Sequence, residues 1–171
     1  MWLDIHWYPR LLRLIAIIMI SLEVVTEEKK WSKKIKNKEI FFFSICKSFP
    51  SKYKFINKRI FLTLLLSNNK NIKKLNEQFR NKNKPTDILS FPFKKKNKFK
   101  NNSYLGDIII SYDFLNKPKN QKTALFKDNV IKIFIHGFLH LLGFDHTKLK
   151  DYKMMLKEEK KIYQYVIKKI Y

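Results

Sequence analysis

Three of the four histidines in the chain lie close together, at His136, His140 and His146. Side chains four residues apart lie on one face of a helix, one turn apart, so the first two imidazoles could share a cation. Gly143 follows where a left-handed residue commonly ends a helix, and such an end would reverse the chain and return His146 to the same point. The spacing therefore predicts one metal ion per chain, held by three histidines at the end of a helix.

The ligand set favours zinc in a catalytic site. Structural zinc sites usually have four protein ligands and favour cysteine, whereas Cys46 is the only cysteine in the chain. Three imidazoles leave one position open, where zinc lowers the pKa of bound water to about 7, so that a hydroxide forms without a carboxylate base. Imidazole also suits nickel and copper, and the residues alone leave the metal open among the three.

The same histidine spacing occurs in metzincin proteases, but one residue differs. In those enzymes a glutamate follows the first histidine and acts as the general base, and Gly137 stands at that position here. The difference disfavours peptide hydrolysis and leaves a metzincin-like protease as the least favoured function.

Four separated motifs closely resemble the YbeY family of bacterial rRNA maturation factors. They lie at residues 76–80, 84–92, 105–111 and 136–146, in the family's order, and the resemblance runs from about Met19 to the C-terminus. It implies a single-strand-specific, zinc-dependent endoribonuclease that acts in maturation of the 16S rRNA 3′ end and in ribosome quality control.

The same resemblance implies partners and a location. Single-stranded RNA, rRNA and the small ribosomal subunit are the expected partners, with a ribosomal protein or an assembly GTPase as further candidates and no membrane. The expected location is the cytoplasm. A second class of function stays open, in which the chain is an RNA-binding ribosome-assembly factor whose zinc is mainly structural.

Two further side chains are candidates for the site. Arg80 is one of only four arginines among 37 basic residues, and it falls at the arginine of the family's Tyr-Arg pair, with Phe79 in place of the tyrosine. A guanidinium fork suits the charge of a phosphodiester transition state, so Arg80 is predicted to bind phosphate, with a cation at a helix end as the alternative. Asp145 either orients a histidine ligand through its free ring N–H or serves as a turn residue.

The composition agrees with a nucleic-acid partner. The chain carries 37 Lys and Arg against 14 Asp and Glu, a formal net charge of +23, which favours an anionic ligand. The abundance of lysine, asparagine, isoleucine and phenylalanine is also typical of an AT-rich genome, so part of this charge belongs to solvated surfaces. All three glycines lie in the motifs above, which leaves none for a nucleotide-binding loop.

The hydrophobic pattern predicts one α+β domain over residues 19–171, with one four-stranded mixed sheet backed by helices. Strands are expected at 19–26, 59–66, 87–93 and 104–112, the second buried on both faces and the last two joined by an exposed hairpin-like loop. Helices are expected at 29–49, at 69–80 behind an Asn68 or Asn69 cap, from a Thr123 cap to about Leu142, and at 150–170.

Residues 1–18 are expected to lie outside this domain as a doubtful leader. Arg10 and Arg13 precede an apolar run that resembles part of a signal peptide. The run is too short to span a bilayer, and no small-residue cleavage site follows it. We interpret Met19 as the natural start of the protein, with a membrane anchor as the alternative.

Overall fold

A computed structural model of the chain describes residues 20–55, 58–93, 100–119 and 121–170. The centre of the fold is one four-stranded sheet, with the strands in the order β1 (Ile20–Thr26), β2 (Ile60–Ser67), β4 (Ser103–Ser111) and β3 (Ile88–Pro92). β1, β2 and β4 run parallel, and β3 pairs antiparallel with β4. The prediction of an α+β fold with a mixed four-stranded sheet is confirmed.

Two predictions fall outside the described residues. The leader at residues 1–18 with a start at Met19 is one, and most of the exposed loop between β3 and β4 is the other. Both stay predictions. In the part of the chain that is described, no helix combines the length and apolar character needed to cross a membrane.

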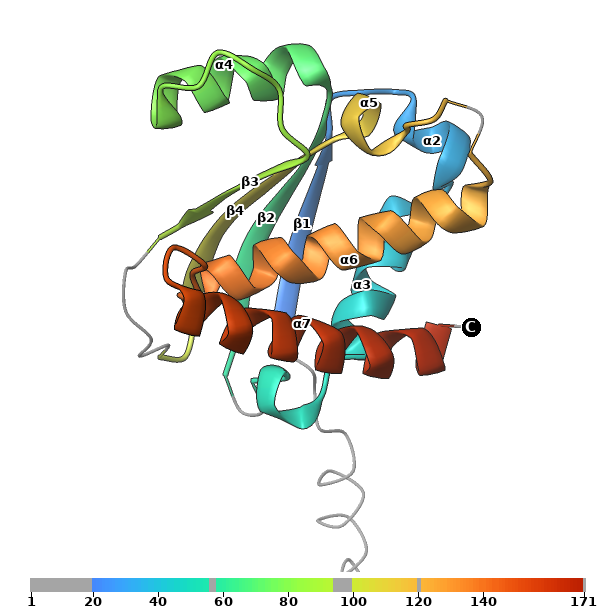
Figure 1. Cartoon of the computed structure of the whole chain (residues 1–171). Helices are drawn as coiled ribbons and strands as arrows, with labels where there is room; N and C mark the ends of the chain where they lie inside the picture. The colour runs from blue at the N-terminus through green and yellow to red at the C-terminus, as the bar shows by residue number, and fades with distance from the viewer. Residues whose placement is uncertain (1–19, 56–57, 94–99, 120, 171) are drawn as a thin grey trace, which may run out of the picture.

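Helices cover the two faces of the sheet unequally (Figure 1). One face lies under α6 (Thr123–Leu141), with α3 (Lys38–Lys47) and α7 (Leu149–Ile170) packed beside it. The other face carries α4 (Asn69–Arg80). Short helices at α2 (Trp31–Lys34), η2 (Ser51–Tyr53) and α5 (Tyr112–Leu115) complete the described elements.

Alternation along the strands produces two hydrophobic cores. Leu64, Ile108 and Ile110 belong to the large core with α6, whereas Leu65 and Ile109 belong to a small core under α4. The prediction that β2 is buried on both faces is wrong, because α4 covers only part of its face. The outward-facing Phe61 of β2 remains 38% exposed.

The helix predicted over residues 29–49 is in fact two helices, α2 and α3. Ile35 adopts an extended conformation with φ −132° and ψ 101°, and Asn37 directly precedes α3. Asparagine is unfavourable in helix interiors because its side chain competes for backbone hydrogen bonds, and a break at this point agrees with that preference. α3 buries Phe42, Ile45 and Cys46, whereas Ile40 and Phe43 are exposed.

The remaining helix boundaries follow the predictions closely, with one correction. Asn68 caps α4, since its side chain accepts a hydrogen bond from the Asn71 N–H at 3.0 Å. Thr123 is not a cap, because it is the first residue of α6 and the capping position before it is taken by Lys122, which makes no side-chain capping bond. The helix carrying the histidines therefore depends on burial of its apolar face rather than on a cap.

Gly137 marks the closest approach of α6 to the sheet. A methyl group built at this glycine would lie 2.5 Å from Cδ1 of Ile88 and 3.0 Å from Oγ of Ser90, both on β3. It would also lie 3.2 Å from a methyl carbon of Ile108 on β4. The residue after the first histidine therefore faces Ile88 and Ser90 of β3, and any side chain at this position would have to displace them.

We predict that Gly137→Glu lowers the free energy of unfolding by roughly 2 kcal/mol or more, because any side chain there must displace Ile88 and Ser90 and would bring a carboxylate into the contact between helix and sheet. Urea denaturation of the purified chain measures this change. Ala124→Glu, at an exposed position of the same helix, is the control and should shift the value by less than about 0.5 kcal/mol. Equal stability of the two variants would contradict the close packing at Gly137.

Candidate metal centre

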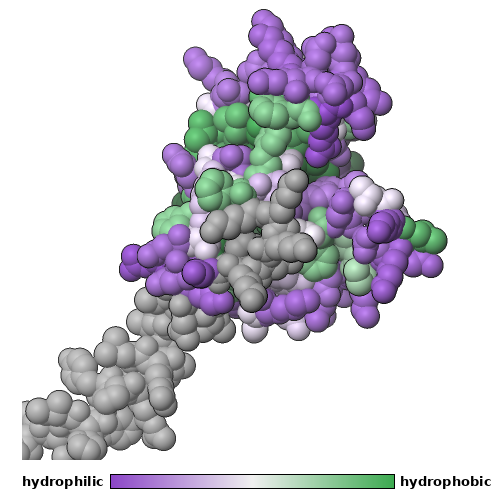
Figure 2. Space-filling view, turned by 90° about the vertical axis from the view of Figure 1, so that its left-hand side faces the viewer, coloured by the Kyte–Doolittle hydropathy of each residue, from purple (hydrophilic) through white to green (hydrophobic). Residues whose placement is uncertain are grey.

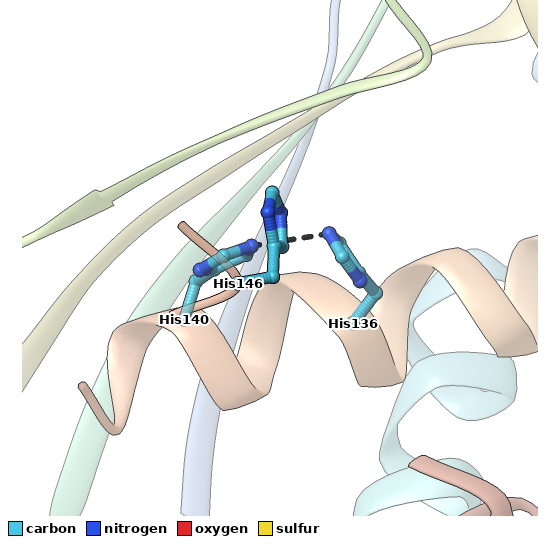
Figure 3. A group of neighbouring side chains, drawn as sticks. All are labelled: His136, His140 and His146. Carbon is cyan, nitrogen blue, oxygen red and sulfur yellow. Dashed lines mark hydrogen bonds between the residues drawn. The ribbon is translucent and has the colours of Figure 1, made fainter. Parts of the chain in front are cut away.

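The three predicted histidines converge in the structure (Figure 3). His136 and His140 lie one turn apart near the end of α6, and His146 lies in the segment that follows. Their rings are 4.6 to 5.5 Å apart between centroids, and one ligand atom from each lies within 4.8 Å of the others. The spacing read from the sequence thus brings three imidazoles to one point.

The chain reversal at Gly143 is what returns His146 to the helix. Gly143 has φ +86°, and its N–H donates to the carbonyl of His140 at 2.9 Å. The N–H of Phe144 donates to the carbonyl of Leu139 at 3.0 Å. These two bonds form a Schellman motif, the helix ending for which glycine is favoured. The prediction that Gly143 ends the helix is confirmed.

Hydrogen bonds on the outer ring nitrogens orient two of the histidines. Nδ1 of His140 lies 2.9 Å from the carbonyl oxygen of Phe144. A carbonyl can only accept, so this Nδ1 carries the proton and donates it. Nδ1 of His136 lies 2.7 Å from Oε1 of Glu159 on α7, and an ionised carboxylate likewise accepts. With one proton on each ring, the lone pair is therefore on Nε2, which faces the centre of the group.

The donor set fits a metal ion. The two Nε2 atoms of His136 and His140 are 3.1 Å apart, close to the about 3.4 Å that separates two nitrogens around a tetrahedral zinc with Zn–N bonds near 2.1 Å. Burial, together with His136 and His146, lowers the pKa of His140 to about 4, so this imidazole is neutral at physiological pH and free to coordinate. Two facing lone pairs repel unless a proton or a cation lies between them.

Glu159 was not predicted from the sequence. It lies in the middle of α7, far along the chain from His136, and only the packing of α7 against α6 brings the two together. A usable signal does exist in the sequence. Glu159 falls on the same helix face as Met155 and Ile162, which are both buried, so a carboxylate on the inner stripe of this helix points to a specific partner.

Asp145 has contacts that match the turn alternative. Its Oδ1 accepts a hydrogen bond from the His146 N–H at 2.7 Å, and its Oδ2 accepts one from the Thr147 hydroxyl at 3.3 Å. The bond from the His146 N–H is the main cause of the lowered pKa of Asp145. Both carboxylate oxygens thus shape the turn that carries His146, and among the described residues no histidine ring contacts them.

Arg80 lines the same cleft as the histidines. The cleft has a volume of about 890 Å³, and its walls include Arg80 at the end of α4, Lys82 after it, Ser90 of β3, and the three histidines. Arg80 is exposed, and its guanidinium makes no hydrogen bond or ion pair with any other residue that the structure describes. α4 ends directly after it, where Asn81 adopts a left-handed conformation with φ 53°. The guanidinium is therefore available to a ligand.

The surface beside this cleft is strongly hydrophilic over α4. Figure 2 shows hydrophilic side chains gathered at the top of the molecule, where α4 lies. They include the exposed Lys70, Lys73 and Lys74.

Cys46 does not contribute to any metal site, because it is buried in the core and burial raises the pKa of its thiol to about 12.

Comparison with known proteins agrees with these features. The profile of the family described as Endoribonuclease YbeY matches residues 25–166. Endoribonuclease YbeY of Pelagibacter ubique is 65% identical over 152 residues, which cover 89% of this chain and 99% of that protein. Its namesake from Fusobacterium nucleatum is 37% identical over 105 residues, or 60% of this chain and 65% of that protein.

A solved structure shares the fold. The solution structure of TM1509 from Thermotoga maritima superposes with a TM-score of 0.52 at 26% sequence identity. The match covers 85% of this chain and 89% of that chain.

The geometry predicts about one zinc ion per chain. Elemental analysis measures the stoichiometry after the purified protein has been loaded with zinc and dialysed to remove the unbound ion. A His136→Ala/His140→Ala double variant should retain close to none, because one imidazole cannot hold the ion alone. Undiminished zinc in the double variant would show that the metal binds elsewhere.

Proposed function

Since the chain belongs to the YbeY endoribonuclease family, we propose that it is a metal-dependent endoribonuclease that hydrolyses phosphodiester bonds of single-stranded RNA. The observation that carries the proposal is the composition of one cleft. Three imidazoles converge in its lining, which also includes Arg80, whose guanidinium has no partner among the residues that the structure describes. A phosphodiester bound there would meet both groups.

We assign the metal site to His136, His140 and His146, with zinc as the proposed ion. When bound, zinc supplies Lewis-acid chemistry and lowers the pKa of a coordinated water. The three neutral rings leave the ion its full positive charge, and fewer protein ligands than a structural site usually has leave a position open. This ligand count favours catalysis over a mainly structural metal.

Arg80 is the proposed phosphate ligand. Its guanidinium presents several N–H donors in a fixed plane, which can bind two non-bridging phosphate oxygens at once. Negative charge on those oxygens grows as the phosphodiester is attacked, so donors that are already in place stabilise the transition state more than the ground state. Lys82 at the same wall adds positive charge but no fork.

The proposed biological substrate is ribosomal RNA. The family resemblance supports a role in maturation of the 16S rRNA 3′ end and in ribosome quality control, in the cytoplasm and with the small ribosomal subunit as partner. Ribosomal proteins or an assembly GTPase are further candidate partners. The net charge of +23 supports an RNA ligand. A single strand can bend its backbone into a cleft, whereas a stiff duplex cannot.

Peptide hydrolysis is not supported by the same site. The position that carries the general base in metzincin proteases is Gly137, which packs against β3. Ser90 and Ile88 occupy the space that a side chain would need.

RNA turnover tests the proposal directly. Zinc-loaded protein should cleave a labelled single-stranded RNA and leave the matched duplex largely intact, and His140→Ala should abolish cleavage because it removes a ligand. The products are resolved on denaturing gels. Tight RNA binding without any cleavage during a long incubation would favour the ribosome-assembly factor with a structural zinc instead.

We predict that Arg80→Lys lowers single-turnover cleavage by about 100-fold at saturating RNA, because a point charge cannot reproduce two parallel contacts. Zinc content is measured alongside and should not change. The control is Lys73→Ala/Lys74→Ala on the exposed face of the same helix, which should weaken RNA affinity in a salt-dependent way and leave saturated turnover nearly intact. If Arg80→Lys cleaved RNA at the rate of the unmodified chain, Arg80 would be a structural cation and not a phosphate ligand.

A further inference from the structure

We propose that Glu159 is a positioning residue for the metal site, which it serves by holding His136 in the tautomer and orientation that coordinate the ion. The inference rests on the proposed histidine metal site but not on RNA cleavage. It assigns a function to the C-terminal helix α7, which contributes none of the three histidines.

The contact between Glu159 and His136 is a short hydrogen bond to a carboxylate. Oε1 of Glu159 lies 2.7 Å from Nδ1 of His136, and both side chains are about three-quarters buried, with relative exposures of 25% and 27%. A carboxylate that accepts from Nδ1–H keeps the proton on that nitrogen and leaves Nε2 as the donor atom for a metal. Carboxylate partners of this kind orient ligating histidines and raise their basicity.

The support of Glu159 is rigid. Met155 lies one turn before it and Ile162 one turn after it on α7, with relative exposures of 1% and 0%. Because both anchor the helix in the core, the carboxylate cannot leave His136 without a change in side-chain conformation or undocking of α7. The His140 ring has a different support, the carbonyl of Phe144 in the reversal after α6. Two ligands thus have their tautomers fixed by two separate elements.

The position of Glu159 excludes a role as general base. It contacts Nδ1, which lies on the opposite side of the imidazole from Nε2, and Nε2 is the atom that faces His140 at 3.1 Å. A group bound at the centre of the histidine cluster would be separated from the carboxylate by the ring of His136. Glu159 therefore acts through His136 and does not replace the glutamate of the metzincin pattern.

The neighbouring residue offers a matched control. Glu158 is also a partly buried carboxylate on α7 with partners in the structure, but these are the Tyr53 hydroxyl and the Lys52 ammonium, 3.4 Å away in the latter case. Removing either carboxylate changes the net charge by the same amount; Glu158→Ala breaks two side-chain contacts of α7 with η2, and Glu159→Ala breaks one with α6. Only Glu159 contacts a predicted metal ligand.

Zinc affinity of the full-length protein, measured by competition with a chelator, tests the inference. Glu159→Ala should bind zinc roughly 10- to 100-fold more weakly than the unmodified chain, and Glu158→Ala should bind it normally. Glu159→Gln should lose less than Glu159→Ala, because its amide oxygen can still accept from Nδ1–H. Thermal midpoints of all three variants separate a loss of affinity from a loss of folding.

A second measurement does not need the metal. In metal-free protein at about pH 8, histidine ¹⁵N chemical shifts should show His136 protonated on Nδ1, and Glu159→Ala should shift it towards a mixture of the two tautomers, while Glu158→Ala should not. Unchanged zinc affinity and an unchanged tautomer in Glu159→Ala would overturn the inference. Failure of the unmodified chain to bind zinc would instead overturn the proposed metal site, and the tautomer measurement would still decide the position of Glu159.

Discussion

The contact of α6 with β3 at Gly137 is the constraint on which the site depends. Because the glycine has no side chain, the helix axis can come close enough for Ile88 and Ser90 to fill the space against it. Successive residues of a helix are about 100° apart, so the neighbouring His136 and the following His140 emerge beside this contact line and into the cleft that β3 borders. Depth and direction of the histidine cluster are both set by this packing.

A basic chain uses its few carboxylates for specific contacts between elements. The chain has 14 acidic residues against 37 basic ones, and most of the lysines that the structure describes have no acidic partner. Ion pairs at exposed positions contribute little in any case. Asp113 joins α5 to Lys30 and to the N-terminus of α4, and Glu158 joins α7 to η2. Glu159 belongs to the same group, since it joins α7 to α6. The chain as a whole has far more positive than negative charge, but these few carboxylates fix the positions of neighbouring helices.

Local signals in the sequence predicted most of the fold and the centre of the site. Helical spacing of His136 and His140 and the glycine after them depend on neighbours in the chain, and so do the strand alternation and the Asn68 cap. The break near Ile35 was missed because the apolar spacing continues through it. The partial exposure of β2 and the contact of Glu159 with His136 depend on which element packs where, and periodicity contains no information about that.

The position of α7 at the end of the chain has a consequence for the order in which the protein is made. Synthesis proceeds from the N-terminus, so all three histidines leave the ribosome before Glu159 does. A chain that stops before α7 would contain every imidazole and the Gly143 reversal, but neither the carboxylate against His136 nor the buried Met155 and Ile162 that fix its place. In this arrangement the alignment of His136 requires α7, and a nascent chain released before α7 would contain all three ligands but would lack the support of one of them.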